Sequence, residues 1–267
     1  MPIMQNHANS LRIARVGTVL RAVLPALLTT GAVLAAWQAL CWSGRFPPPV
    51  LVAPSDVWAT LADLARNGDL ARNWLASIRR VVLGVAVGGL AGFLFGILCG
   101  TQPRLWRQVA PSFAGLRQVP FIVLGPLLIM VFGINETFIV FMLAVATFFP
   151  LALAVIDGLQ NVSGRYEEVT FLLQLGARDR FRLLYLPAIL PALLTGSRIA
   201  LNRCWGLVVA AELFGASSGL GQMMNEAREM FDIGTVMAGA IVTTATGLLL
   251  DMALRTSAAR VMYWKHR

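Results

Sequence analysis

Apolar residues along this chain gather into long stretches that short polar segments separate. Six such stretches cover about 22–42, 81–100, 110–132, 137–159, 187–212 and 235–254. Because a helix needs roughly 20 mainly apolar residues to cross the hydrocarbon core of a membrane, each stretch is long enough to span one. Soluble cores also contain apolar helices, but stretches of this length with so little polar sequence between them favour the membrane. The pattern predicts an all-α integral membrane fold with six transmembrane helices.

The first apolar stretch follows the basic residues Arg12, Arg15 and Arg21, which is also typical of a signal peptide. Its apolar run exceeds the roughly 7–15 residues usual for a signal peptide, and no convincing cleavage site precedes its end. We therefore expect a retained first helix. The third and fourth stretches are separated only by GINE, residues 133–136, which predicts a tight hairpin.

The distribution of Lys and Arg predicts the orientation of these helices. With the N-terminus inside, 13 of the 22 basic residues fall in the inner segments 1–21, 101–109, 160–186 and 255–267. Only six fall in the outer segments 43–80, 133–136 and 213–234. Both termini are therefore predicted to be cytoplasmic. The net charge of +9 is explained by topology and by attraction to anionic membrane lipids, and it does not indicate nucleic-acid binding.

The same pattern divides the chain into segments. They are a cytoplasmic tail (1–21), a first transmembrane helix (22–42), a periplasmic linker (43–80), a core of five transmembrane helices (81–255) and a cytoplasmic tail (256–267). The linker contains SDVWATLADLARNG, which predicts a short amphipathic surface helix that Ser55 caps and Asn67-Gly68 ends. In the outer loop 213–234, a Gly/Ser-rich turn precedes MMNEAREMF, a second short helix. That helix either packs on the bundle or docks an external partner.

Catalytic motifs are missing from the sequence. It contains no HExxH, GxSxG or GxxxxGK[ST] pattern, so we expect neither an enzyme nor a bound metal or nucleotide. Cys41, Cys99 and Cys204 are scattered along the spans without metal-ligand spacing and are interpreted as packing residues. If the protein transports a solute actively, the energy comes from an ion gradient or from another subunit.

Ionisable side chains inside membrane spans are costly and mark functional sites by default. Arg198 lies near the middle of the fifth stretch, and Asn202 follows four residues later on the same helical face. Together with Glu212 near the outer end, they are candidate residues of a pathway for an anionic solute. An internal pair between Arg198 and a carboxylate on a neighbouring helix is the alternative. Arg117 is close enough to an inner end to snorkel, and Arg203 lies further out than Arg198.

The cytoplasmic segment GRYEEVTFLLQLGARDRFRLLYLP, residues 164–187, gathers seven charged residues in a chain with only 13% charged residues. Glu167 and Glu168 suit the first turn of a helix, where the dipole favours acids. Gly176 can adopt the left-handed conformation that ends a helix. The segment therefore predicts a helix, a glycine turn and a second helix. Its mixture of charged and apolar side chains indicates a docking surface.

The stretch LGARDRFRLLYLPAILPALLTGSRIAL resembles the cytoplasmic loop of bacterial ATP-binding cassette importer permeases. Gly176 fits the glycine of that family's motif, and Leu186-Pro187 fits its hydrophobic-Leu-Pro end. The resemblance covers about residues 50–255 and is most specific in AAELFGASSGLGQMMNEAR, which is similar to permeases for nitrate, sulfonates and taurine. Thr170 stands where the motif has its first glutamate, so Glu167 or Glu168 could replace that contact. Asn202 stands where the family commonly has glycine.

The resemblance implies a type I importer permease fold and a set of partners. They are a second copy of the chain, two ATP-binding cassette ATPase subunits and a periplasmic or lipid-anchored solute-binding protein, with membrane lipids around them. ATP and Mg²⁺ would act on the ATPase subunits and not on this chain. The implied coupling residues are Glu167, Glu168, Thr170, Leu175, Gly176, Ala177, Arg178, Arg180 and Pro187. The implied residues for docking the binding protein are Ser217, Ser218, Gly219, Gly221 and Arg228.

The function implied is that of a multi-pass permease subunit in the bacterial inner membrane. Its solute is expected to be small and anionic, like a sulfonate, taurine or nitrate. Two alternatives stay open at this point. One is an importer of the same type for a small heterocycle such as a pyrimidine vitamin precursor. The other is a secondary transporter driven by an ion gradient, which should show internal repeats.

Overall fold

The computed structural model describes residues 25, 28–45, 51–162 and 164–261, and in that part the chain is helical without a strand. Four helices are long and apolar enough to cross a membrane: Asp69–Thr101, Glu136–Gln160, Ala177–Glu212 and Ile233–Ala258. A shorter apolar helix, Leu28–Trp42, covers most of the first predicted span. Residues 22–24 and 26–27 of that span lie outside the described residues, as do the predicted tail 1–21 and residues 262–267.

Four predicted spans are confirmed as helices. They correspond to α3 (Asp69–Thr101), α6 (Glu136–Gln160), α9 (Leu186–Glu212) and α11 (Ile233–Val261). α6 and α9 match the predicted ranges 137–159 and 187–212 to within one residue at each end. α3 begins well before residue 81, because Gly68 turns the chain with a φ of 82° and the polar residues Asn73 and Arg80 find partners on other segments of the bundle.

A single continuous helix over the third stretch, 110–132, is wrong. The structure divides this stretch between α4 (Pro103–Gln118) and α5 (Gly125–Phe132). Val119 precedes Pro120 and takes an extended conformation, with φ −66° and ψ 122°, because the proline ring disfavours a helical residue before it. Pro126 then lies in the first turn of α5, where a proline needs no hydrogen-bonded N–H. The two prolines explain both ends of the interruption.

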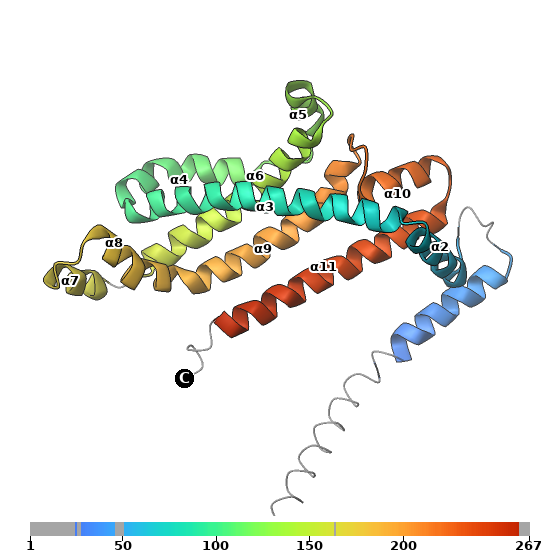
Figure 1. Cartoon of the computed structure of the whole chain (residues 1–267), viewed down its shortest axis with the longest axis horizontal. Coiled ribbons are helices and arrows are strands. Elements are labelled where there is room, and N and C mark those ends of the chain that lie inside the picture. The colour runs from blue at the N-terminus through green and yellow to red at the C-terminus, as the bar shows by residue number, and fades with distance from the viewer. Residues whose placement is uncertain (1–24, 26–27, 46–50, 163, 262–267) are drawn as a thin grey trace, which may run out of the picture.

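The short elements lie at the two ends of the bundle. They are α2 (Pro54–Arg66), α7 (Gly164–Leu172), α8 (Ala177–Arg180), the π-helical turn η1 (Phe181–Tyr185) and α10 (Leu220–Glu229). α2 begins at Pro54 with Ala53 as its N-cap, so the predicted cap by Ser55 is wrong. Asn135 accepts a hydrogen bond from the Phe138 amide, 3.1 Å, and closes the predicted hairpin before α6. Figure 1 shows α7 and α8 at one end of the long helices and α2 and α10 at the other.

Small residues let the long helices approach closely. Glycines recur at every fourth position of α3: Gly84, Gly88, Gly92, Gly96 and Gly100. A Cβ atom on Gly88 would lie 2.0 Å from the carbonyl oxygen of Ala144 in α6. On the other side of α6, a Cβ on Gly196 of α9 would lie 2.4 Å from the Cβ of Ala154. Because lipid supplies no hydrophobic drive between helices, this backbone-close packing holds α3, α6 and α9 together.

Candidate functional site

The α7–α8 end of the bundle exposes large apolar side chains. Leu172 of α7 is 82% exposed, and the exposed neighbours that continue the patch are Tyr166, Val169, Phe171 and Leu173. Glu168 and Arg178 are exposed beside them. Single exposed apolar residues are ordinary, but a contiguous apolar patch rimmed by charges is typical of a surface that meets another protein.

Gly176 lies between α7 and α8 and has an ordinary backbone. Its φ of −63° and ψ of 161° are extended, so the predicted left-handed conformation is wrong. Gln174 takes the left-handed conformation instead, with a φ of 53°. A Cβ atom built on Gly176 would meet nothing within 4 Å. Within the described part of the chain, nothing requires a glycine at this position.

The other predicted coupling residues separate into internal and exposed groups. Thr170 is buried and donates a hydrogen bond to the carbonyl of Glu167, 2.7 Å. Glu167 in turn accepts one from the hydroxyl of Tyr185, 3.1 Å, which ties α7 to η1. Glu168 has no such internal contact among the described residues and faces solvent.

The remaining residues of this group lie around the turn and at the start of α9. The guanidinium of Arg180 stacks over the ring of Phe171, 4.3 Å from its centre. Leu175 is half-buried, Ala177 and Arg178 are exposed, and Pro187 lies in the first turn of α9. The structure therefore brings the predicted coupling residues together at one end of the bundle.

At the opposite end, Glu212 is completely buried in an internal network. Its carboxylate accepts hydrogen bonds from Arg80 Nη1 at 2.7 Å and from Ser77 Oγ at 2.8 Å, both on α3. The Gly221 amide donates a further bond to Glu212, 2.8 Å. Arg80 also donates to the carboxylate of Glu136, at the start of α6. Glu212 thus joins α3, α6 and α9 to the outer loop and does not face a pathway.

The outer loop folds tightly over this network. Gly219 has a φ of 121°, and a Cβ there would lie 2.4 Å from the Glu212 carboxyl group. A Cβ on Gly221 would lie 2.3 Å from the carbonyl oxygen of Val209. Arg80 Nη1 donates to the backbone carbonyl of Ser218, 2.6 Å. These three residues serve the fold, whereas Ser217 and Arg228 remain exposed.

Arg198 and Asn202 also have internal partners. Arg198 forms an ion pair with Asp251 of α11, and Asn202 donates a hydrogen bond to the same carboxylate, 3.3 Å. Arg255, one turn further along α11, pairs with Asp251 at 2.8 Å. This arrangement favours the internal pair for Arg198 over a direct contact with solute.

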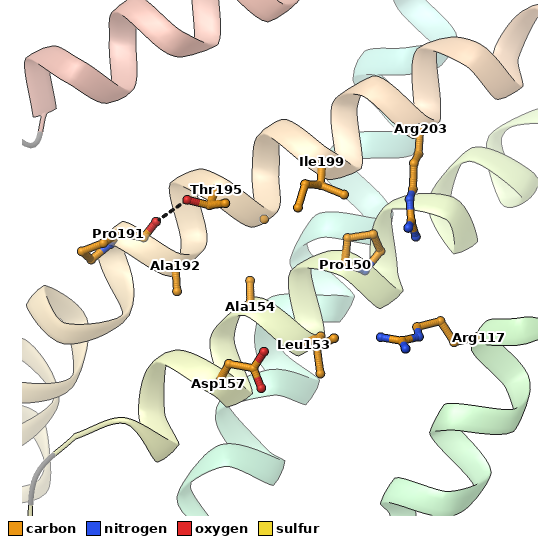
Figure 2. Close-up of a pocket in the computed structure, with 11 residues that line it drawn as sticks. Arg117, Pro150, Leu153, Ala154, Asp157, Pro191, Ala192, Thr195, Ile199 and Arg203 are labelled. Carbon is orange, nitrogen blue, oxygen red and sulfur yellow. Dashed lines mark hydrogen bonds between the residues drawn. The ribbon is translucent and has the colours of Figure 1, made fainter.

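A cavity of about 500 Å³ lies between α4, α6 and α9. Figure 2 shows the side chains of Arg117 and Arg203 directed toward this space from α4 and α9. Asp157 of α6 lines the same cavity. A smaller cavity of about 270 Å³ adjoins it and shares Arg117 and Arg203.

Sequence reasoning missed Arg80 and this cavity. Arg80 lies one residue before the predicted span, yet its side chain is only 2% exposed. The available signal was its spacing: Ser77, Arg80, Gly84 and Gly88 follow each other at three- and four-residue intervals on one face of α3. Arg117 and Arg203 lie far apart in the sequence, so no spacing could bring them together.

The chain matches a known family over much of its length. The family described as "Binding-protein-dependent transport system inner membrane component" matches residues 92–263. The chain is 32% identical to the SsuC protein of Bacillus subtilis (strain 168), named as an aliphatic sulfonates transport permease; the match covers 90% of this chain and 87% of that protein. It is 31% identical to the taurine transport system permease protein TauC of Escherichia coli (strain K12); this match covers 91% of this chain and 90% of that protein. It is 28% identical to the nitrate import permease protein NrtB of Leptolyngbya laminosa; this match covers 93% of this chain and 91% of that protein.

The fold is also similar to a solved structure. A chain of the MetNI methionine ABC transporter, solved in inward-facing conformations, superposes with a TM-score of 0.55 at 20% sequence identity. The match covers 71% of this chain and 94% of that chain. At this identity, the similarity concerns the fold.

Proposed function

Because the chain belongs to the family of binding-protein-dependent transport system inner membrane components, we propose that it carries a small anionic solute across the membrane, driven by a separate ATPase. The chain is a multi-pass inner-membrane permease of the sulfonate, nitrate and taurine type. In the proposal, two copies of the chain form the pathway. α7 and α8 face the cytoplasm, and α2 and α10 face the periplasm.

The observation that carries the coupling part of the proposal is the α7–α8 end. It combines an exposed apolar patch around Leu172 with a glycine, Gly176, that the chain's own fold does not require. An ATPase subunit that packs closely against the turn explains both features, since a side chain at Gly176 would then occupy space that the partner needs. Glu168 and Arg178 supply the charges at the edge of this contact.

The proposal places the contact with a solute-binding protein at the outer end. Ser217 and Arg228 are exposed there, as are Met230 and Phe231 just beyond α10, at 79% and 75%. An external binding protein that docks on these side chains would deliver solute above the long helices. The proposed solute class is supported by the relatives, whose names specify aliphatic sulfonates, taurine and nitrate.

Copurification tests the proposal. The chain is tagged in its native host, extracted gently from the membrane, and the proteins that accompany it are identified. We expect an ATP-binding cassette subunit, which is lost when Leu172 and Leu173 are both changed to Asp. The matched control is the double variant Met230→Asp and Phe231→Asp, which places the same two charges at equally exposed positions of the other end.

Uptake completes the test. Solute uptake into vesicles should require ATP and persist after the ion gradients are collapsed. A chain that purifies without an ATPase, and whose uptake follows an ion gradient, would refute the proposal. Loss of the ATPase from the control variant as well would show that the contact is not specific to the α7–α8 end.

A further inference from the structure

The cavity between α4, α6 and α9 contains two cationic groups without a paired anion. Among the described residues, neither Arg117 nor Arg203 lies within salt-bridge distance of a carboxylate. Asp157 attracts Arg117 electrostatically but forms no ion pair with it. Arg198 shows the contrast, because its guanidinium is paired with Asp251. The cavity thus has one more positive than negative charge.

Arg117 and Arg203 are exposed to the cavity and not buried in the bundle, so a solute in the cavity can reach both guanidinium groups. Arginine suits the oxygens of a sulfonate or a carboxylate, because its planar group donates several hydrogen bonds in a fixed geometry. Arg117 and Arg203 come from different helices, α4 and α9, and point toward one space. An anion bound there would contact both helices at once.

Apart from the two arginines, Asp157 and Thr195, the residues that line the cavity are apolar. Its walls are formed mainly by Pro150, Leu153, Ala154, Pro191, Ala192 and Ile199. The hydroxyl of Thr195 donates to the carbonyl of Pro191, 3.0 Å, and is therefore already engaged. Such walls offer an inorganic anion nothing in place of water, but they can bury a short hydrocarbon chain.

The volume of the cavity also favours an organic anion over a small inorganic one. A water molecule takes up about 30 Å³ in the liquid, and a cavity of about 500 Å³ is far larger than one small anion. Cavities in this range commonly hold small organic molecules, with few polar groups that fix their orientation. The combination of two arginines at one side and an aliphatic wall at the other matches an organic anion with a short alkyl chain.

We propose that this cavity is the solute-binding chamber of the permease and that it takes an aliphatic organic anion of the alkanesulfonate class rather than nitrate. Arg117 and Arg203 bind the sulfonate oxygens, and the wall around Leu153 and Ile199 covers the alkyl chain. The inference rests on the proposed function. It assigns the solute to residues other than the ion-paired Arg198 and the buried Glu212.

Protection of an introduced thiol tests this site directly. Thr195→Cys places a reactive group in the cavity wall at an exposed position, in a Cys41→Ser background; Cys99 and Cys204 are buried. The purified complex in lipid nanodiscs is alkylated in the presence of three probes: butanesulfonate, nitrate and 1-butanol. We expect butanesulfonate to slow alkylation and the other two to have no effect, because one lacks the chain and the other lacks the charge.

Chain length and charge give graded readouts. From ethanesulfonate to pentanesulfonate, the concentration that halves the alkylation rate should fall by up to about fourfold per methylene. Arg117→Gln and Arg203→Gln should each raise that concentration at least about tenfold, as expected for lost charge-assisted hydrogen bonds. Arg107→Gln removes the same charge from α4 outside the cavity, so the concentration that halves the alkylation rate should stay unchanged.

Several outcomes would overturn the assignment. Equal protection by nitrate and butanesulfonate would show that the wall does not contact the solute. Protection that survives in the Arg117→Gln, Arg203→Gln double variant would exclude the arginines. If Thr195→Cys prevents assembly, Leu153→Cys on the facing helix replaces it, and absence of protection there also refutes the site. Copurification of the ATPase subunit is measured in the same samples, so a failure of this site is distinguishable from a failure of the proposed function.

Discussion

Charged side chains are buried and paired at one end of the helical bundle and exposed at the other. At the outer end, Arg80 and Glu212 are almost completely buried, and each is satisfied by partners within the chain. At the α7–α8 end, Glu168 and Arg178 are exposed beside an apolar patch that nothing in the described chain covers. The ionic network at the outer end is therefore complete within the chain, whereas the charges and the apolar patch at the α7–α8 end have no such partners among the described residues.

The difference has a mechanical meaning for a transporter. A buried ion pair that joins α3, α6, α9 and the outer loop makes one end rigid, because moving any element would leave a charge without its partner. At the other end, a single side-chain hydrogen bond among the described residues, between Glu167 and Tyr185, joins α7 to η1. A force applied by an ATPase subunit at α7 and α8 would therefore move that end of the bundle relative to the outer end, which the buried ion pair holds in place.

The largest effect should come from breaking the buried pair. Glu212→Ala leaves Arg80 buried without its closest partner, which we expect to lower the free energy of unfolding by about 3–5 kcal/mol. The measurement is unfolding of the purified chain in mixed micelles, followed by tryptophan fluorescence. Glu168→Ala removes the same charge at the exposed end and should change stability by no more than about 0.5 kcal/mol. Equal destabilisation by the two variants would contradict the comparison.

A smaller effect is expected at the packed seam that connects the two ends. Gly88→Ala forces a methyl group against the carbonyl of Ala144, so α3 and α6 must separate, at about 1–3 kcal/mol. Gly115→Ala is the matched change in a helix where a Cβ meets nothing within 4 Å. There the better helix propensity of alanine should leave stability equal or slightly higher, by up to about 1 kcal/mol. Destabilisation of both variants by similar amounts would mean that close packing at Gly88 is not the cause.

Loss of the Tyr185 hydroxyl group should loosen the attachment of α7 to η1. Tyr185→Phe removes the hydrogen bond to Glu167, which we expect to weaken local stability by about 1 kcal/mol without unfolding the bundle. Hydrogen exchange of the α7 amides should accelerate about fivefold, and that of α6 should stay unchanged. Tyr166→Phe, which changes an exposed tyrosine of α7 itself, is the control. Unchanged exchange in Tyr185→Phe would show that α7 is held by other contacts.

Much of the helical framework was predictable, because it depends on local properties of the sequence. α6 and α9 are mainly apolar runs of membrane-spanning length, so their ends follow the change from apolar to polar residues. The interruption between α4 and α5 was overlooked, although Pro120 and Gly125-Pro126 mark it locally. Hydropathy averages over such a stretch and does not register where a proline prevents a helical residue.

The candidate sites were less predictable, because they depend on contacts between distant segments. Arg80 and Glu212 are 132 residues apart in the sequence, and the burial of their pair cannot be inferred from either neighbourhood. The same is true of Arg117 and Arg203 at the cavity. Arg198 was found, and its pairing with a carboxylate was one of two open interpretations, since a mid-span arginine indicates a partner but not which one. The α7–α8 segment was identified correctly as helical, whereas the conformation of Gly176 was not.

The smallest effect on the isolated chain, and the largest on its function, is expected at Gly176. Gly176→Leu should change the free energy of unfolding by no more than about 0.5 kcal/mol, because its φ of −63° suits any residue and its Cβ would meet open space. In the assembled transporter, the leucine would instead collide with the ATPase subunit, so ATP hydrolysis should continue while solute uptake falls at least about tenfold. Gly164→Leu, at a glycine of α7 with equally open surroundings, should transport normally. Normal uptake by Gly176→Leu would mean that this end of the bundle is an ordinary exposed loop, and the contrast between the two ends would then reflect solvent exposure and not coupling.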